Sequence, residues 1–121
     1  MKKTNLAITG CMGRMGQQII KSVKKDKNFK LVTITESKRI DKKINGIKID
    51  LNTEKAFKKA DVIVDFTIPR CTFQVLKIAS SSLGRKFLSK VFEVHHRHKK
   101  DYPSGTALML GKGIAKGKNK D

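Results

Sequence analysis

Three short apolar runs, each bounded by polar residues or glycine, predict buried β-strands in the first half of the chain. They span Leu6–Ile8, Leu31–Ile34 and Val62–Phe66, and the last is rich in β-branched residues. A weaker pattern from Ile44 to Leu51, around Asn45-Gly46, predicts a short edge strand.

Helical spacing fills the stretches between these runs. Residues Met15–Lys25 carry their apolar positions on one stripe. A second, short helix, which Asn52 or Thr53 can cap, is predicted to run to Ala60. A third helix is expected over Pro69–Leu83 without a break. The stripe of the first helix consists of Met15, Ile19, Ile20 and Val23.

The alternation of strands and helices predicts an α/β fold. A β-α-β-β-α-β series is typical of a Rossmann-like parallel sheet, here one mononucleotide-binding half of a doubly wound sheet. Right-handed crossovers then fix the topology. Further along, Val91–Val94 predicts one more strand, Ser104 a helix cap and Ala107–Leu110 the apolar run of that helix. The last residues, Lys116–Asp121, are polar and are expected to fray.

Basic residues far outnumber acidic ones. The 121-residue chain has 28 Lys and Arg against 10 Asp and Glu, a formal net charge of +18. Such a surplus is found in polyanion-binding proteins. However, the lysines are scattered in pairs, and aromatic residues that could stack on bases are few. We therefore expect a solvated basic surface and no specific nucleic-acid partner, with a basic nucleic-acid-binding protein as an alternative.

Cysteine content and hydropathy bear on the compartment. Cys11 and Cys71 are too few for a disulfide framework and are expected to be buried thiols in a reducing environment. No apolar run reaches membrane-spanning length, and the basic start lacks a signal-peptide core. The sequence therefore predicts a cytoplasmic chain without a membrane partner.

A glycine-rich turn follows the first predicted strand. Gly10, Gly13 and Gly16 are spaced by three and lie between a strand and a helix, the context that a dinucleotide-binding turn requires. Gly10 allows a tight turn, Gly13 lets the backbone approach a pyrophosphate, and Gly16 lets helix and strand pack closely. The helix N-terminus offers N–H groups to the phosphates. These features predict a cofactor site.

An acidic residue accompanies the turn. Glu36 ends the second predicted strand, twenty residues past Gly16, where a carboxylate accepts hydrogen bonds from an adenosine ribose. Lys38 and Arg39 follow and could meet a 2′-phosphate, so NADH and NADPH are both candidate cofactors. The alternative is a structural turn with a solvated Glu36.

Residues 93–108 combine histidines with a helix start. His95 and His96 follow the predicted strand, and the N–H groups of Gly105 and Thr106 can hold a carboxylate or phosphate. A metal site that adds His98 is disfavoured, because adjacent strand residues point to opposite faces and no fourth ligand is evident. A basic surface loop is the other alternative.

Three segments, Gly13–Gly16, Asp65–Pro69 and Glu93–Leu108, resemble those of dihydrodipicolinate reductases, the nicotinamide-dependent enzymes of lysine and diaminopimelate biosynthesis. The resemblance implies an oxidoreductase that uses NADH or NADPH to reduce a small dicarboxylate. It implies that His95 is the general acid and that Lys99 orients the substrate. The implied substrate contacts are His96, Ser104, Gly105 and Thr106, and the implied cofactor contacts are Gly10, Gly13, Arg14, Met15, Gly16, Glu36, Phe66 and Thr67.

The resemblance also implies a shortened chain. Residues 1–79 follow the family's dinucleotide-binding domain, and residues 80–121 follow the beginning of its α+β substrate domain. The family's intervening strand, nicotinamide-covering loop and hinge are missing between them, and so are the sheet strands that follow. We therefore expect impaired activity, an exposed apolar sheet edge and no oligomer of the family type. A non-catalytic nucleotide-binding remnant is the alternative function.

Overall fold

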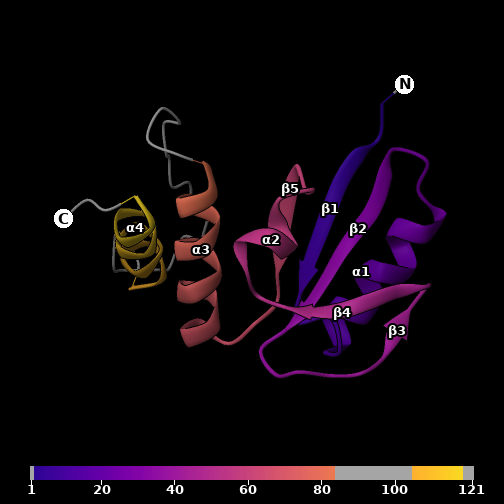
Figure 1. Ribbon diagram of the computed structural model, residues 1–121, viewed down its shortest axis with the longest axis horizontal. Helices are drawn as coiled ribbons and strands as arrows, with labels where there is room; N and C mark the ends of the chain where they lie inside the picture. The colour runs from indigo at the N-terminus through magenta and orange to yellow at the C-terminus, as the bar shows by residue number, and fades with distance from the viewer. Residues whose placement is uncertain (1, 84–104, 119–121) are drawn as a thin grey trace, which may run out of the picture.

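The computed structural model describes residues 2–83 and 105–118, and a mostly parallel sheet lies at its centre (Figure 1). The strand order is β3-β4-β2-β1-β5, in which β3 alone is antiparallel to its neighbour. The strands span Thr4–Thr9 (β1), Phe29–Glu36 (β2), Lys43–Ile44 (β3), Ile47–Leu51 (β4) and Val62–Asp65 (β5). This architecture confirms the predicted Rossmann-like α/β fold class.

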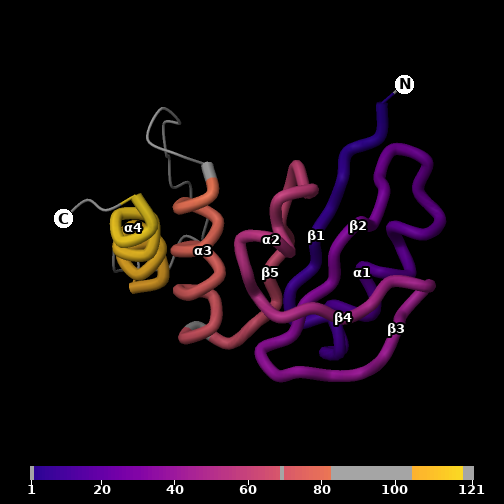
Figure 2. Tube along the Cα trace, viewed as in Figure 1, coloured from indigo at the N-terminus to yellow at the C-terminus, as the bar shows by residue number. Residues whose placement is uncertain are grey.

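Helices cover both faces of the sheet. On one face, α1 packs over Ile8 and Ile34, which are fully buried. On the other face, Ala7 of β1 contacts Phe57 of α2 and Val75 of α3. The last helix, α4, packs against α3 and extends the molecule away from the sheet (Figure 2). The helices span Arg14–Lys25 (α1), Glu54–Phe57 (α2), Pro69–Leu83 (α3) and Gly105–Gly117 (α4).

Two predicted elements differ in extent from those observed. The expected edge strand is a hairpin, because Asn45 and Gly46 both adopt positive φ angles, 51° and 78°, and turn β3 back onto β4. Thr53 caps α2 by accepting a hydrogen bond from the Ala56 N–H at 3.1 Å, but this helix is one turn long and ends before Ala60.

Burial also corrects several expectations. Met15 is 56% exposed and does not belong to the buried stripe of α1. Cys71 is only half-buried, whereas Cys11 is fully buried. The predicted fraying is wrong for Lys116–Lys118: α4 continues to Gly117 and Lys118 is buried, because the end of α4 packs closely on α3. Residues 119–121 lie outside the described residues. The predicted strand Val91–Val94 lies outside the described residues.

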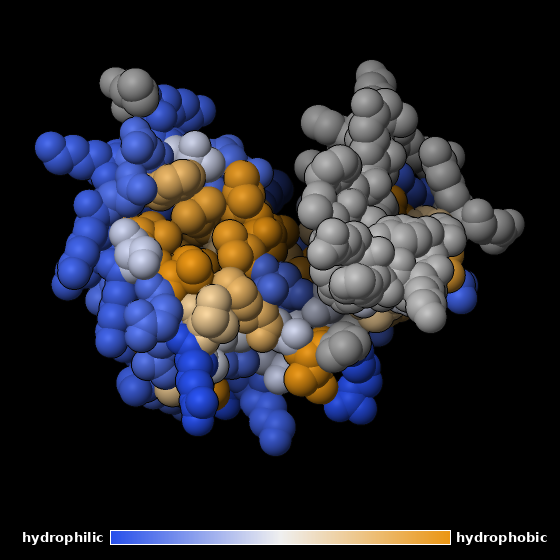
Figure 3. Space-filling view, turned by 180° about the vertical axis from the view of Figure 1, so that it is seen from behind, coloured by the Kyte–Doolittle hydropathy of each residue, from blue (hydrophilic) through white to orange (hydrophobic). Residues whose placement is uncertain are grey.

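The β5 edge of the sheet is open in the described part of the chain. There, β5 pairs with β1 and with no strand on its other side, and Val62 is 46% exposed. Seen from behind, apolar residues form a continuous area on the sheet half of the molecule (Figure 3). Within the described residues, the open β5 strand is consistent with the predicted exposed edge, which stays a prediction for the whole chain. No helix within residues 2–83 and 105–118 is both long and apolar enough to cross a membrane.

Candidate functional site

The parallel strands bring three polar segments to one edge of the sheet. Gly10 follows β1, Glu36 ends β2, and Asp65 ends β5. Because β1 lies between β2 and β5, the carboxyl ends of these strands are neighbours. In an open α/β sheet, this edge is where ligands bind.

The glycine turn is shaped by close backbone contacts. Gly10 has φ +67°, and a Cβ atom there would lie 2.8 Å from the Phe66 carbonyl oxygen. A Cβ atom at Gly16 would lie 2.3 Å from the Gly10 carbonyl oxygen. Gly13 differs, since its Cβ position lies 3.4 Å from the nearest atom, an ordinary contact distance. Gly13 is also the N-cap residue of α1 and provides no side-chain cap, which leaves the helix N-terminus available for an anion.

Glu36 is tied directly to the turn. Its Oε2 atom accepts a hydrogen bond from the Met12 N–H at 2.8 Å. Beside it, burial and then the charge of Glu36 raise the pKa of the Cys11 thiol to about 11, so this thiol stays protonated at neutral pH. The sequence placed Glu36 correctly at the end of β2, and the structure adds its contact with the turn.

Asp65 gathers three threonine hydroxyls. Its Oδ1 atom accepts hydrogen bonds from the hydroxyls of Thr9 and, at 2.6 Å, Thr67, and from the Thr67 N–H at 3.2 Å. Its Oδ2 atom accepts from the Thr72 hydroxyl at 2.5 Å. Partial burial raises the pKa of the Asp65 carboxyl, but the bonds from Thr67, Thr72 and Thr9 outweigh it, and the pKa lies below its usual value.

A cavity of about 560 Å³ lies beside this cluster. Thr67 and Thr72 line it from the loop after β5 and the start of α3. Gly105 and Thr106, the first residues of α4, line it from the other side, together with Met109. Thr67, which is predicted to contact the cofactor, therefore shares one cavity with Gly105 and Thr106, which are predicted to contact the substrate.

A second groove, of about 450 Å³, lies elsewhere, between α2 and strands β2 and β4. Arg39, Asp41, Lys48 and Lys55 are among its lining residues. Apart from Arg39, a candidate partner of a 2′-phosphate, it contains none of the predicted cofactor or substrate contacts, so we place the site at the cavity between Thr67 and Thr106.

The structure describes only part of the predicted site. Four predicted residues, His95, His96, Lys99 and Ser104, lie outside the described residues. Within the described ranges, no group of three potential ligands could hold a metal ion. The sequence did not single out Thr9, Asp65, Thr72 or Met109. Asp65 stands inside a quoted motif, but only the folded chain shows that hydroxyls from three segments meet on it.

A parallel sheet with a glycine turn, a helix N-terminus and an acid at the end of β2 defines the nucleotide-binding part of a nicotinamide-dependent oxidoreductase. Comparisons with known proteins identify the family within this class. The chain matches the family models for the N-terminus of dihydrodipicolinate reductase over residues 4–86 and for its C-terminus over residues 70–121. The chain belongs to the dihydrodipicolinate reductase family.

Two relatives of similar sequence agree with this assignment. The chain is 51% identical to the 4-hydroxy-tetrahydrodipicolinate reductase of Pelagibacter ubique (strain HTCC1062), over all of this chain and 67% of that protein. It is 31% identical to that of Buchnera aphidicola subsp. Schizaphis graminum, over 96% of this chain and 66% of that protein. A solved structure, a dipicolinate-bound dihydrodipicolinate reductase from Paenisporosarcina sp. TG-14, shares 20% identity with a TM-score of 0.49, covering 97% of this chain and 67% of that one.

Members of this family are oxidoreductases of lysine and diaminopimelate biosynthesis that use NADH or NADPH. The predicted family, enzyme class and cofactor class are thereby confirmed, and the two alternative functions are not favoured. The chain spans about two thirds of the length of these relatives.

The alignment also shows an internal gap. The comparison with the Pelagibacter protein runs over 172 positions and takes in all 121 residues, so 172 minus 121 leaves at least 51 positions without a residue here. They lie inside the chain, because the alignment includes both of its ends. The two family models overlap over residues 70–86, around the predicted boundary at residue 79, which stays a prediction.

Proposed function

We propose that this chain binds NADH or NADPH and reduces dihydrodipicolinate to tetrahydrodipicolinate. The observation that carries the proposal is the shared cavity. Thr67 and Thr72 come from the nucleotide-binding half, and Gly105 and Thr106 begin the helix in which the family's substrate motif ends. A cofactor bound along the carboxyl edge of the sheet would thus reach the pocket that holds the substrate.

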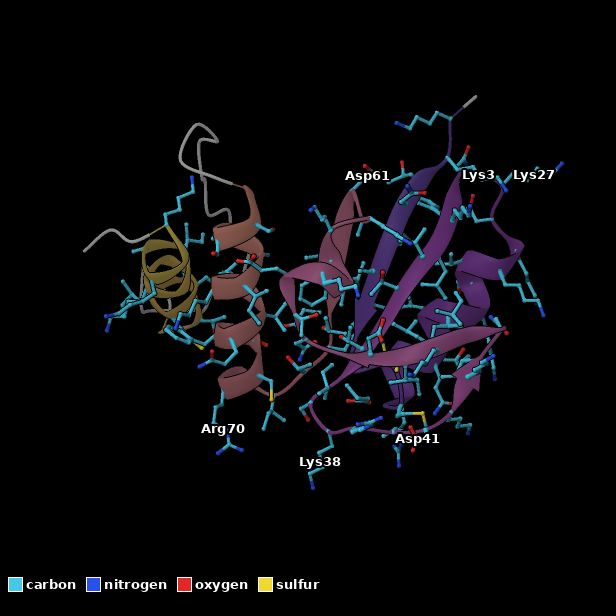
Figure 4. The ribbon with its side chains drawn as sticks, viewed as in Figure 1. Lys3, Lys27, Lys38, Asp41, Asp61 and Arg70 are labelled. Atoms are coloured by element: carbon cyan, nitrogen blue, oxygen red, sulfur yellow. The ribbon has the colours of Figure 1, made fainter. Side chains whose placement is uncertain are left out.

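The cofactor end is supported by space and by charge. A pyrophosphate can approach Gly13 because no protein atom crowds its Cβ position, and the N–H groups of the first turn of α1 can hold it. Glu36 suits the adenosine ribose. Lys38 and Arg70 lie at this same end of the molecule (Figure 4), where cations favour an anionic ligand. The bound nicotinamide supplies the hydride.

The substrate end is proposed from the family motif. Gly105, Thr106 and Ser104 hold a carboxylate, and His96 is a further substrate contact. His95 donates the proton that completes addition of hydride and proton across a ring double bond, and Lys99 orients the dianion. The boundary between the two domains lies at residue 79. The chain acts in the cytoplasm on a small dicarboxylate. It has no specific nucleic-acid partner and does not form an oligomer of the family type.

Two measurements test this proposal. Fluorescence titration should show that NADH binds, and loss of NADH absorbance with dihydrodipicolinate should show turnover. His95→Gln should lower kcat by roughly 100- to 10,000-fold without changing the Kd for NADH, because it removes only the proton donor. His98→Gln is the matched control and should leave kcat unchanged. Failure of the wild-type chain to bind NADH or NADPH would refute the proposal.

A further inference from the structure

The charge of Asp65 is balanced by hydroxyl groups. Within residues 2–83 and 105–118, no lysine or arginine forms an ion pair with Asp65. Three threonine hydroxyls and one backbone N–H take that role. Hydrogen bonds to an ionised carboxylate are stronger than those between neutral groups, so these four partners are held firmly.

The carboxylate fixes the direction of two hydroxyl protons. A threonine hydroxyl has one proton to donate and two lone pairs that accept. The closest acceptor of Thr67 is Asp65 Oδ1 at 2.6 Å, and that of Thr72 is Asp65 Oδ2 at 2.5 Å. The hydroxyl oxygens of Thr67 and Thr72 lie 3.1 Å apart, and neither proton is left for this contact. Both oxygens therefore present only lone pairs to a ligand.

The opposite wall of the cavity has the opposite polarity. The first N–H groups of an α-helix have no acceptor within the helix, and Gly105 and Thr106 begin α4. Their side of the cavity favours carboxylate or carbonyl oxygens. The cavity is therefore lined by acceptors at Thr67 and Thr72 and by donors at Gly105 and Thr106.

We propose that Asp65 determines ligand specificity by making Thr67 and Thr72 obligate acceptors, so that the ligand atom facing them must donate a hydrogen bond, as an N–H does. This inference rests on the proposed function and deepens it. Two sources fit the chemistry: the carboxamide NH₂ of the nicotinamide, and the ring nitrogen of the substrate when this imine nitrogen is protonated and carries an N–H. An NH₂ group has one hydrogen for each hydroxyl oxygen. Asp65 acts through the threonines and is a positioning residue.

The test compares ligands that differ in this donor. NADH is compared with its reduced acetylpyridine analogue, in which a methyl group replaces the carboxamide NH₂. Piperidine-2,6-dicarboxylate, whose ring nitrogen carries hydrogen, is compared with pyridine-2,6-dicarboxylate, whose ring nitrogen only accepts. In at least one pair, the ligand that carries the N–H donor should bind to the wild-type chain with a Kd about tenfold lower than that of its partner ligand. This is the effect of about one hydrogen bond. The pair that responds identifies the source.

Asp65→Asn should reduce this preference to about twofold or less. The amide offers one donor and one acceptor, so one hydroxyl must accept from it and turn its own proton to the cavity. Asp61→Asn is the matched control: it makes the same change at the opposite end of β5, where Asp61 accepts from the Asn5 N–H at 2.9 Å (Figure 4). It should keep the tenfold preference. A general loss of stability would weaken both ligands of a pair and leave their ratio unchanged.

The outcomes separate the two proposals. If NADH binds to the wild-type chain but neither pair shows a preference that Asp65→Asn removes, the role of Asp65 is refuted and the proposed function stands. If NADH does not bind but the dicarboxylate pair shows the preference, the proposed function is refuted and the role of Asp65 stands. If no ligand of either pair binds, both are refuted.

Discussion

The three glycines of the turn differ in the reason why a side chain would not fit at each position. At Gly10 and Gly16, the protein's own backbone occupies the Cβ position, so substitution there disturbs the fold itself. At Gly13, the backbone has an ordinary conformation, with φ −73° and ψ 167°, and a Cβ atom would make only an ordinary contact, 3.4 Å from the Gly10 carbonyl oxygen. Any requirement for glycine at position 13 must therefore come from a ligand.

Gly13→Ala is thus a clean probe of nucleotide binding. We expect its free energy of unfolding to lie within about 1 kcal/mol of the wild-type value, because substitutions without new clashes are nearly neutral. It should weaken NADH binding tenfold or more, and Gly13→Val should abolish it, because each side chain holds the pyrophosphate away from the backbone. Chemical denaturation and NADH titration measure the two effects. Unchanged NADH affinity in Gly13→Val would place the phosphates elsewhere.

A second prediction for a single residue concerns Asp65 and the pH dependence of the stability of the fold. Its pKa is lower in the folded chain than its usual value of 3.8, so the unfolded chain binds the proton more readily. The carboxylate therefore stabilises the fold above pH 3.8, and this contribution is lost as the pH falls through the lowered pKa. Asp65→Asn should cost roughly 1–3 kcal/mol at pH 7, from the loss of charge-assisted hydrogen bonds.

Urea unfolding at a series of pH values measures this difference. The gap between the wild type and Asp65→Asn should be constant near neutrality and shrink below about pH 4. Asp61→Asn serves again as the matched control. A gap that stayed constant down to pH 2 would show that Asp65 acts through packing and not through its charge.

Among the secondary-structure elements, the pair of helices α3 and α4 joins the two parts of the chain. Glycines let them approach closely. A Cβ atom at Gly117 would lie 2.3 Å from the Lys77 carbonyl oxygen, and one at Gly113 would lie 3.3 Å from that of Phe73. The position of α4, and with it the cavity wall formed by Gly105 and Thr106, depends on this contact.

Gly117→Ala should therefore destabilise the packing of α4, by roughly 1–3 kcal/mol, because a methyl group cannot fit without a shift of the backbone. Hydrogen exchange of the α4 amides measures it directly. Gly111→Ala is the matched control on the same helix, since no atom lies within 4 Å of its Cβ position. It should be neutral or stabilise the helix by up to about 1 kcal/mol. Equal protection of α4 in both variants would contradict the observed packing.

For the whole molecule, we expect the internal gap to limit activity. At least 51 positions of the Pelagibacter relative have no counterpart, and β5 is an open edge in the described part of the chain. By resemblance, the missing part includes the loop that covers the nicotinamide. A misplacement of about 1 Å can cost on the order of 100-fold in rate, so the shortened chain should turn over slowly.

Inserting the family's missing segment between Ala79 and Ser80 should restore turnover by about 100-fold or more, and His95→Gln in the restored chain should remove it again. An inserted Gly/Ser-rich segment of equal length is the control and should not restore it. Steady-state oxidation of NADH with dihydrodipicolinate measures all three. A rate on the order of 10 per second in the 121-residue chain itself would contradict the predicted impairment.

Local patterns in the sequence determined most of the secondary-structure elements and the cofactor end of the site. Apolar runs and helical spacing predicted the parallel strands and α1, and the glycine turn and Glu36 were placed correctly. These features depend on residues close in the chain, which is why they could be predicted. The hairpin at Asn45-Gly46 was missed, although this dipeptide is a strong turn signal.

Only the tertiary structure decided which distant residues meet. Thr9 reaches Asp65 across 56 positions, and Gly117 packs on Lys77 because α4 lies along α3. Met15 follows the apolar stripe of α1 in sequence but is 56% exposed in the folded chain. Such contacts depend on how elements pack in space, and no local pattern encodes that arrangement.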